Sequence, residues 1–321
     1  MHGDRTGSSL LVLLWHSVDR TWAYPCRPGQ GIHGLGRQLR RLQQVMTVVP
    51  LEPSLQALKS GQRLPARAVA LTFDDGYRDN LDLAVPLLER FGMPATFFLV
   101  PGLLSREVRA WWEVLAWALA SSPKPAVRWG RKELPTRGVP GQRSFRRMLP
   151  DLRTRPRHLT ERAVSELVDW LEPEGEPGDQ NLFLDWDGAR QLVRRGFAVG
   201  SHTMSHAALR YEPADEQLRE LVESRRQLKT ALGVDPRVLA YPYGQLAHYS
   251  AETIHSTARA GYTHAVTVHP RLVRAATPPH EIPRFALEPH RGFGETALLR
   301  IKGRLDRVRR GGPLFGRPTT E

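Results

Sequence analysis

Two adjacent aspartates, Asp74 and Asp75, directly follow the apolar run of residues 69–73. The run has the length and residue types of a buried strand, so both carboxylates are expected at a strand end. Burying an unpaired carboxylate is costly, and two side by side raise the pKa of at least one unless a cation lies beside them. A metal ion would meet this need, and in α/β proteins the carboxyl ends of strands are where ligand sites form.

Two histidines with metal-ligand spacing lie later in the chain, in the segment SHTMSH of residues 201–206. Four residues apart, His202 and His206 face the same way on one helical turn or a tight loop. Imidazole and carboxylate together are a common ligand set for zinc and similar divalent metals. The sequence therefore predicts a three-ligand site formed by Asp75, His202 and His206, with open positions for water and substrate. Asp74 would remain beside the metal as the general base for water.

Each motif has a simpler interpretation when it is taken alone. An Asp-Asp-Gly segment after a strand is often only a turn or a helix cap. A His-x-x-x-His pair is more often a surface or capping pair than a ligand pair. Because both motifs directly follow apolar strands, their combination favours a shared site.

The segments TFDDG (72–76) and SHTMSH resemble the signatures of the polysaccharide deacetylase family, the carbohydrate esterases with a NodB-type domain. The resemblance extends from about residue 10 to about residue 287. It implies that Asp74 is the catalytic base and that Asp75, His202 and His206 bind a divalent metal, zinc first, with cobalt, nickel or iron as alternatives. It also implies a distorted (β/α)7-type barrel that removes acetyl groups from N-acetylated sugars of a polysaccharide, oligosaccharide or glycolipid.

The segment WHSV (15–18) resembles the start of the branch that includes poly-N-acetylglucosamine deacetylases, with Trp15 in place of its tyrosine. In that branch the histidine lies in the active site and is proposed to protonate the leaving amine, a role that falls here on His16. The resemblance thus points to exopolysaccharide metabolism. The alternative is a strand-end histidine satisfied by the backbone. His269 is the weaker candidate for the acid, because the leucine context of the family's late histidine motif is absent.

The family's third motif is only partly present. Pro242 and Tyr243 are retained, and in the family the backbone N–H of this tyrosine helps to form the oxyanion hole. Other residues stand where the family has an arginine before them. Arg284, after the last expected strand, is the candidate to supply the missing guanidinium near Asp74. This departure leaves open a non-catalytic glycan-binding relative as an alternative to the deacetylase. An O-acetyl esterase that uses the same metal centre is a second alternative.

Apolar strands and amphipathic helices alternate along the chain, which predicts an α/β fold with a parallel sheet and right-handed crossovers. Residues of about 101–181 interrupt the alternation and are interpreted as a helical insertion beside the barrel mouth, within a deacetylase domain of residues 1–300. A tryptophan stripe in the insertion is more typical of packing than of sugar stacking. The helix of residues 218–232 is interpreted as scaffold, and residues 301–321 as a basic tail.

The formal net charge of +13 comes mostly from arginine. Solvated arginine-rich faces are the simplest explanation, and peripheral association with an anionic membrane is the next. No nucleic-acid recognition motif is present. Cys26 is the only cysteine, so no internal disulfide can form. The apolar run of residues 10–15 is too short for a signal peptide, and no run reaches a membrane span. A cytoplasmic location is therefore expected, with membrane association as an option and the oligomeric state open.

Overall fold

The computed structural model describes residues 8–27, 29–178 and 181–288. The basic tail expected at 301–321 and the end of the expected domain lie outside these residues. The centre of the described part is a curled, parallel sheet. Its strand order is β10-β1-β3-β4-β7-β8-β9, and β2 pairs with β3. The strands are β1 (Leu11–Trp15), β2 (Thr47–Val48), β3 (Ala68–Phe73), β4 (Thr96–Leu99), β7 (Ala198–Ser201), β8 (Val238–Ala240), β9 (His264–Val266) and β10 (Phe285–Ala286).

The segment of residues 282–287 contains the edge strand β10 and also contacts β9 at the opposite edge of the sheet. The Ile282 N–H donates to the Ala265 carbonyl (2.8 Å) of β9, and the Leu287 N–H donates to the Leu14 carbonyl (2.8 Å) of β1, the strand that pairs with β10. One short stretch therefore links the two edges, which confirms the distorted (β/α)7-type barrel. Arg284 lies in the middle of this stretch.

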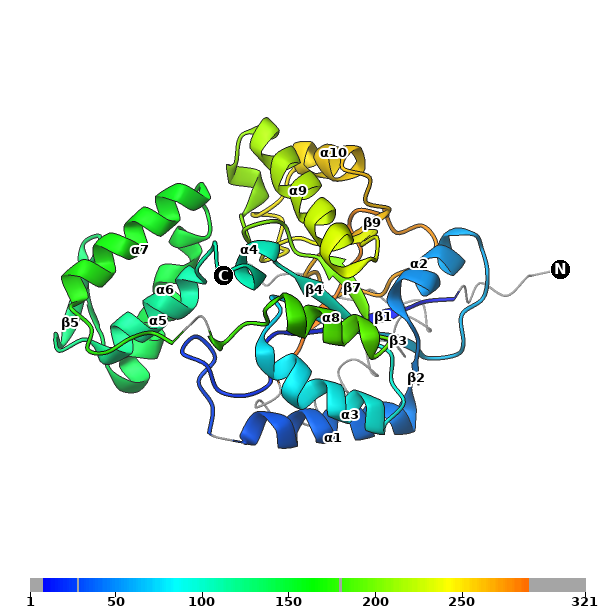
Figure 1. Cartoon of the computed structure of the whole chain (residues 1–321), viewed down its shortest axis with the longest axis horizontal. Coiled ribbons are helices and arrows are strands. Elements are labelled where there is room, and N and C mark those ends of the chain that lie inside the picture. Colours follow the sequence, from blue (N-terminus) through cyan, green and yellow to red (C-terminus); the bar gives the residue numbers. More distant parts are fainter. Residues whose placement is uncertain (1–7, 28, 179–180, 289–321) are drawn as a thin grey trace, which may run out of the picture.

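Helices surround the sheet (Figure 1) because each buries one apolar face against it. Leu35, Leu39 and Leu42 of α1, for example, pack with Leu11 and Leu13 of β1. Successive strand residues point to opposite faces, so Val12 and Ala70 belong to a separate core inside the sheet. The surrounding helices are α1 (Gln30–Val45), α2 (Leu51–Lys59), the π-helical turn η1 (Asn80–Ala84), α3 (Val85–Arg90), α8 (Trp186–Arg194), α9 (Ala214–Leu232) and α10 (Ala251–Arg259).

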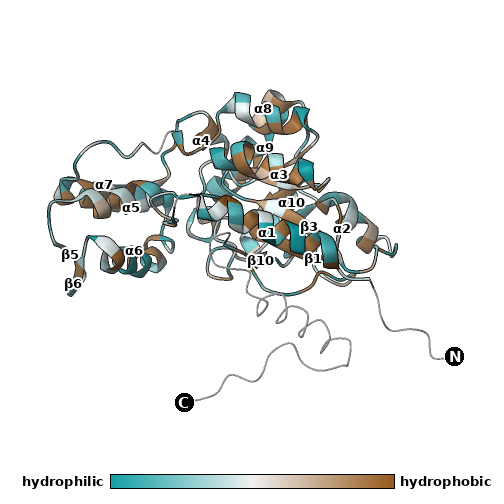
Figure 2. Ribbon diagram, turned by 90° about the horizontal axis from the view of Figure 1, so that it is seen from below, coloured by the Kyte–Doolittle hydropathy of each residue, from teal (hydrophilic) through white to brown (hydrophobic). Residues whose placement is uncertain are grey.

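Between β4 and α8 the chain forms a group of elements beside the barrel, seen at the left of Figures 1 and 2. Its own hydrophobic cluster joins Trp117 to Met148 and Leu171, and Trp111 and Trp112 are also buried in it. The tryptophan stripe therefore serves packing, as expected. The group follows α4 (Pro101–Leu104) and consists of α5 (Trp111–Ser121), β5 (Ala126–Trp129), β6 (Lys132–Pro135), α6 (Gly138–Leu152) and α7 (Arg157–Leu171).

Among the described residues, no helix combines the length and the apolar character that crossing a bilayer would require.

Candidate metal and catalytic site

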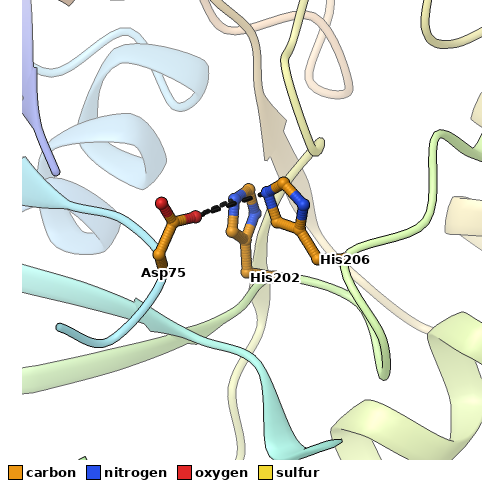
Figure 3. A group of neighbouring side chains, drawn as sticks. All are labelled: Asp75, His202 and His206. Atoms are coloured by element: carbon orange, nitrogen blue, oxygen red, sulfur yellow. Dashed lines mark ion pairs between the residues drawn. The ribbon is translucent and has the colours of Figure 1, made fainter. Parts of the chain in front are cut away.

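Asp75, His202 and His206 meet at the carboxyl end of the sheet, where their ligand atoms all lie within 4.8 Å of one another. The Nε2 atoms of both histidines lie 3.3 Å from Asp75 Oδ1 (Figure 3). All three side chains are buried. The sheet order explains the meeting, because only β4 separates β3, which precedes Asp75, from β7, which precedes His202.

The two imidazoles have different surroundings. The Nδ1 atom of His202 lies 2.7 Å from the Ala240 carbonyl, which can only accept, so this nitrogen carries the proton and Nε2 is left as a ligand atom. The Nδ1 atom of His206 is buried and has no hydrogen-bond partner among the described residues. The His206 ring packs between Trp112 (centroids 4.5 Å apart) and Tyr243 (4.8 Å).

The electrostatics of this cluster favour a bound cation. Burial alone would raise the pKa of Asp75, but the hydrogen bonds from His202 and His206 hold it well below its usual value. Burial lowers the pKa of His206 to about 4. Burial also acts to lower the pKa of His202, yet Asp74 and Asp75 outweigh it and raise that pKa. The carboxylates thus attract one positive charge to this point, and two imidazoles and a carboxylate fit a divalent metal ion.

Backbone conformation in the site is unusual. Asp75 (φ 71°), His206 (φ 61°) and Tyr243 (φ 62°) all adopt the left-handed region, which costs a non-glycine residue about 1–3 kcal/mol. Such strain persists only where the surrounding fold imposes it. Gly76 is also left-handed (φ 73°), and a Cβ atom there would lie 3.0 Å from a Leu99 methyl carbon. Glycine at position 76 therefore allows the left-handed turn that follows Asp75 without a contact between a Cβ atom and Leu99.

Asp74 does not belong to the three-ligand cluster and is held by Arg284 instead. Its Oδ1 and Oδ2 atoms accept hydrogen bonds from Nη1 and Nη2 of Arg284, each 2.8 Å long. The guanidinium is fully buried and also donates to the Thr267 carbonyl (3.1 Å) and the Thr72 hydroxyl (3.2 Å). Asp74 Oδ2 remains 3.9 Å from His202 Nε2. The structure thus places the candidate base beside the candidate metal ligands.

Arg284→Ala is expected to lower the free energy of unfolding by about 3–5 kcal/mol, because it removes the partner of the buried Asp74 charge. Denaturant unfolding at neutral pH measures this loss. Arg284→Lys keeps a positive charge but not the paired contact, so its stability should lie between alanine and wild type. An alanine variant as stable as the wild type would show that the ion pair does not hold Asp74.

The remaining predicted residues surround the cluster. His16 is half-buried, its ring stacks on Tyr24 (5.6 Å), and its charge contributes to the lowered pKa of Asp75. Pro242 and Tyr243 follow β8, and the Tyr243 hydroxyl accepts a hydrogen bond from Trp111 Nε1 (3.3 Å). His269, the weaker candidate, lies instead against the Tyr249 hydroxyl (3.1 Å).

Glu220 is a site-supporting residue that sequence analysis missed. Its carboxylate accepts hydrogen bonds from the N–H groups of Met204 (3.0 Å) and Ser205 (2.9 Å) and from the Ser205 hydroxyl (2.5 Å). These residues form the loop between His202 and His206, so α9 holds the ligand loop and is more than scaffold. A signal was present, because Glu220 shares the buried face of α9 with Leu221.

Glu220→Gln is expected to weaken metal binding by about 10–100-fold, as is typical when a group that orients metal ligands is altered. The change keeps the size of the side chain but replaces a charged acceptor by an amide. Titration against a metal chelator measures the affinity. Glu223→Gln is the matched control, since Glu223 lies on the same helix and pairs with Arg226 at the surface. Equal metal affinity in both variants would contradict the role of Glu220.

Helix α5 also reaches the site. Trp112 Nε1 donates to the Tyr77 hydroxyl (2.8 Å), which donates to Glu113 (2.7 Å). Glu113 additionally accepts from the Thr21 hydroxyl (2.9 Å) and the Ala23 N–H (3.0 Å). Burial raises the pKa of Glu113 to about 7. This network joins α5, the loop before α1 and the turn that carries Asp75 into one wall.

The chain resembles known proteins in sequence. The sequence profile of the family described as polysaccharide deacetylase matches residues 61–265. YxkH of Bacillus subtilis (strain 168), whose name describes it as a polysaccharide deacetylase, is 22% identical to this chain over 224 residues. That match covers 70% of this chain and 52% of YxkH, so the chain spans about half the length of this relative.

Solved structures show the same fold. The deacetylase PplD of Streptococcus pyogenes, in complex with acetate, superposes with a TM-score of 0.59 at 17% identity, covering 89% of this chain and 96% of PplD. The de-N-acetylase of Aggregatibacter actinomycetemcomitans gives 0.58 at 18% identity, covering 91% and 99%. IcaB from Ammonifex degensii gives 0.57 at 18% identity, covering 88% and 93%.

The family match covers the segments that carry the three-ligand cluster. It includes Asp74 and Asp75, both histidines of residues 201–206, and Tyr243, whereas His16 and Arg284 lie outside residues 61–265. The part of the sequence that matches is thus the part from which the structure builds the cluster. The chain belongs to the polysaccharide deacetylase family.

Proposed function

We propose that the protein is a metal-dependent N-deacetylase that removes acetyl groups from N-acetylated sugars of a polysaccharide, oligosaccharide or glycolipid. The observation that carries this proposal is the separation of roles between two adjacent carboxylates. Asp75 faces both imidazoles, at 3.3 Å from each Nε2, whereas Asp74 is held by Arg284 through two hydrogen bonds of 2.8 Å. One carboxylate is therefore available as a ligand and the other as a base.

Asp75, His202 and His206 would hold the metal, and their nitrogen and oxygen donors suit zinc first and cobalt, nickel or iron next. A divalent cation bound there supplies Lewis acidity toward the acetyl carbonyl and makes water more acidic. The left-handed backbone of Asp75 and His206 supports this assignment, because strained residues cluster where a ligand is held.

The residues of the chain account for the proton transfers. Asp74 accepts a proton at a carboxylate oxygen as water attacks the acetyl carbon, and the paired contact with Arg284 orients the carboxylate. The Tyr243 N–H is the proposed donor to the oxyanion. His16 gives a proton to the amine nitrogen as the C–N bond breaks. The products are acetate and the free amino sugar.

We also propose that residues 1–300 form one deacetylase domain, in which the insertion of about 101–181 shapes the glycan site. The contact of Trp112 with the His206 ring supports this, since it brings α5 to a candidate ligand. The net charge of +13 supports peripheral attraction to an anionic membrane where lipid-linked glycans would be met.

Acetate release, measured together with bound metal, tests the proposal. The purified protein would be incubated with N-acetylglucosamine oligosaccharides and with matched O-acetylated oligosaccharides. We expect about one metal ion per chain and acetate release from the N-acetyl substrates. Faster release from the O-acetyl substrates would assign an esterase instead. Metal-loaded protein that releases no acetate but binds the oligosaccharides would assign a non-catalytic glycan-binding protein.

A further inference from the structure

A cavity of about 370 Å³ lies against the candidate site. Its lining includes Tyr24, Trp112 and Arg153. Trp112 packs on the His206 ring, and the guanidinium of Arg153 lies over the Tyr243 ring, 4.9 Å from its centroid. A sugar that places its acetyl group at the cluster would therefore extend from it into this cavity.

A second cavity, of about 510 Å³, lies next to the first, between the loop before α1 and helices α5 and α6. Figure 1 shows this loop, in dark blue, running past the group of elements that contains α5 and α6. Each cavity is of the size of a small-molecule site, and together they have room for more than one sugar. Both are lined by Ala23, Pro25, Phe145 and Arg146.

The lining of this groove is strongly basic. Arg146 and Arg153 line the first cavity, and Arg20, Arg27 and Arg146 line the second. The second cavity has no acidic residue in its lining, and Glu288 is the only one in that of the first. The described part of the chain offers none of these four guanidinium groups an ion pair, and Arg153 Nε is buried without a hydrogen-bond partner.

Two carboxylates on the segments that form the groove, those of Asp19 and Glu113, accept hydrogen bonds within the protein. Asp19 accepts hydrogen bonds from the N–H groups of Arg20 (2.8 Å) and Gly29 (3.2 Å). Glu113 is buried beneath the loop, where Thr21, Tyr77 and Ala23 occupy its oxygens. Several like charges facing one groove repel each other unless an anion lies between them. Guanidinium groups pair best with carboxylate or phosphate, which they bind through two parallel hydrogen bonds.

We propose that this groove, the arginine groove, binds a carboxylate or phosphate group on a sugar next to the one that is deacetylated, so that the substrate is an acidic glycan. The inference rests on the proposed deacetylase function and adds the charge of its substrate. The shape of the site argues against a lipid surface, because a bilayer contacts protruding residues whereas these arginines line two adjacent cavities.

Acetate release from three oligosaccharides of equal length tests the inference. One is neutral and made of N-acetylglucosamine, one alternates N-acetylglucosamine with glucuronic acid, and one carries a phosphate on a sugar next to an N-acetylglucosamine. We expect a higher kcat/KM with an acidic oligosaccharide than with the neutral one, and a steeper fall of this kcat/KM with salt. The uronate and phosphate substrates distinguish the two sources of negative charge.

Arg146→Gln tests the groove directly, because Arg146 lines both cavities. The ratio of kcat/KM for the acidic to the neutral substrate should fall about tenfold, the effect of losing one charge-assisted hydrogen bond. Arg147→Gln is the matched control, since Arg147 is the next residue of α6, is exposed and lines neither cavity. Its ratio should equal that of the wild type.

The inference is overturned if the neutral substrate is preferred, or if both glutamine variants change the ratio equally. The arginines would be assigned to a membrane surface instead if Arg146→Gln and Arg147→Gln both bound vesicles that contain phosphatidylserine more weakly, by equal factors, and the kcat/KM ratio of acidic to neutral substrate stayed unchanged. Failure of the proposed function has a different signature, in which no substrate releases acetate. Calorimetric binding of the acidic oligosaccharide would then still test the groove, and equal affinity of the wild type and Arg146→Gln would refute it.

Discussion

Asp74→Asn is expected to retain the metal and to lower kcat by about 10²–10⁴-fold, the usual contribution of a general base. The amide has the shape of the carboxylate but cannot take a proton from water. The metal should remain because the three candidate ligands that cluster are Asp75, His202 and His206, and Asp74 faces Arg284 instead. Steady-state acetate release and metal content per chain, measured on the same preparation, check both halves of the prediction.

The Asp74 variant also leaves the buried Arg284 without its charged partner, so its unfolding must be measured alongside its activity. Assays well below the unfolding temperature separate lost catalysis from lost structure. Asp82→Asn is the control, because Asp82 is an exposed aspartate on the turn that follows the site. A rate for Asp74→Asn within a few-fold of the wild type would remove Asp74 from the role of base.

His202→Ala is expected to abolish both metal binding and acetate release. Removing the imidazole takes away one of three ligands, and metal affinity should fall by more than the 10–100-fold seen when only a supporting residue is changed. The Ala240 carbonyl of β8, 2.7 Å from His202 Nδ1, orients the imidazole, and this oriented donor is lost with it. Metal analysis after dialysis, with and without added zinc, measures the loss.

His255→Ala is the corresponding control, since His255 is exposed on α10, away from the cluster. It should bind metal and release acetate as the wild type does. Full metal content in His202→Ala would show that the three-ligand site is assigned incorrectly. Together, Asp74→Asn and His202→Ala distinguish a residue that acts on water from a residue that holds the cation.

The barrel could be predicted because its strands are short apolar runs and its helices are amphipathic, two patterns that local sequence carries well. Helix α2 has no counterpart among the predicted elements, although Leu51, Leu55 and Leu58 have helical spacing. Asn80, whose type suits a helix cap, lies instead in a π-helical turn, where its side chain donates to the His16 carbonyl (2.8 Å). Local sequence patterns thus predict where helices and strands lie better than they predict the residues at which these elements begin and end.

What the sequence alone determined is the candidate ligand set, because Asp75 and the pair His202 and His206 each occupy one short segment directly after a strand. Residue type and spacing then suffice, since strands of a parallel sheet present such segments at the same edge. Only the tertiary structure decided which distant groups complete the site. Arg284 could be named as a candidate from its place in the chain, but its paired contact with Asp74 is seen only in the folded protein. The support of the histidine loop by Glu220 and the arginine groove likewise join segments that are far apart in the chain. Such contacts depend on strand order and helix packing, which no local pattern encodes.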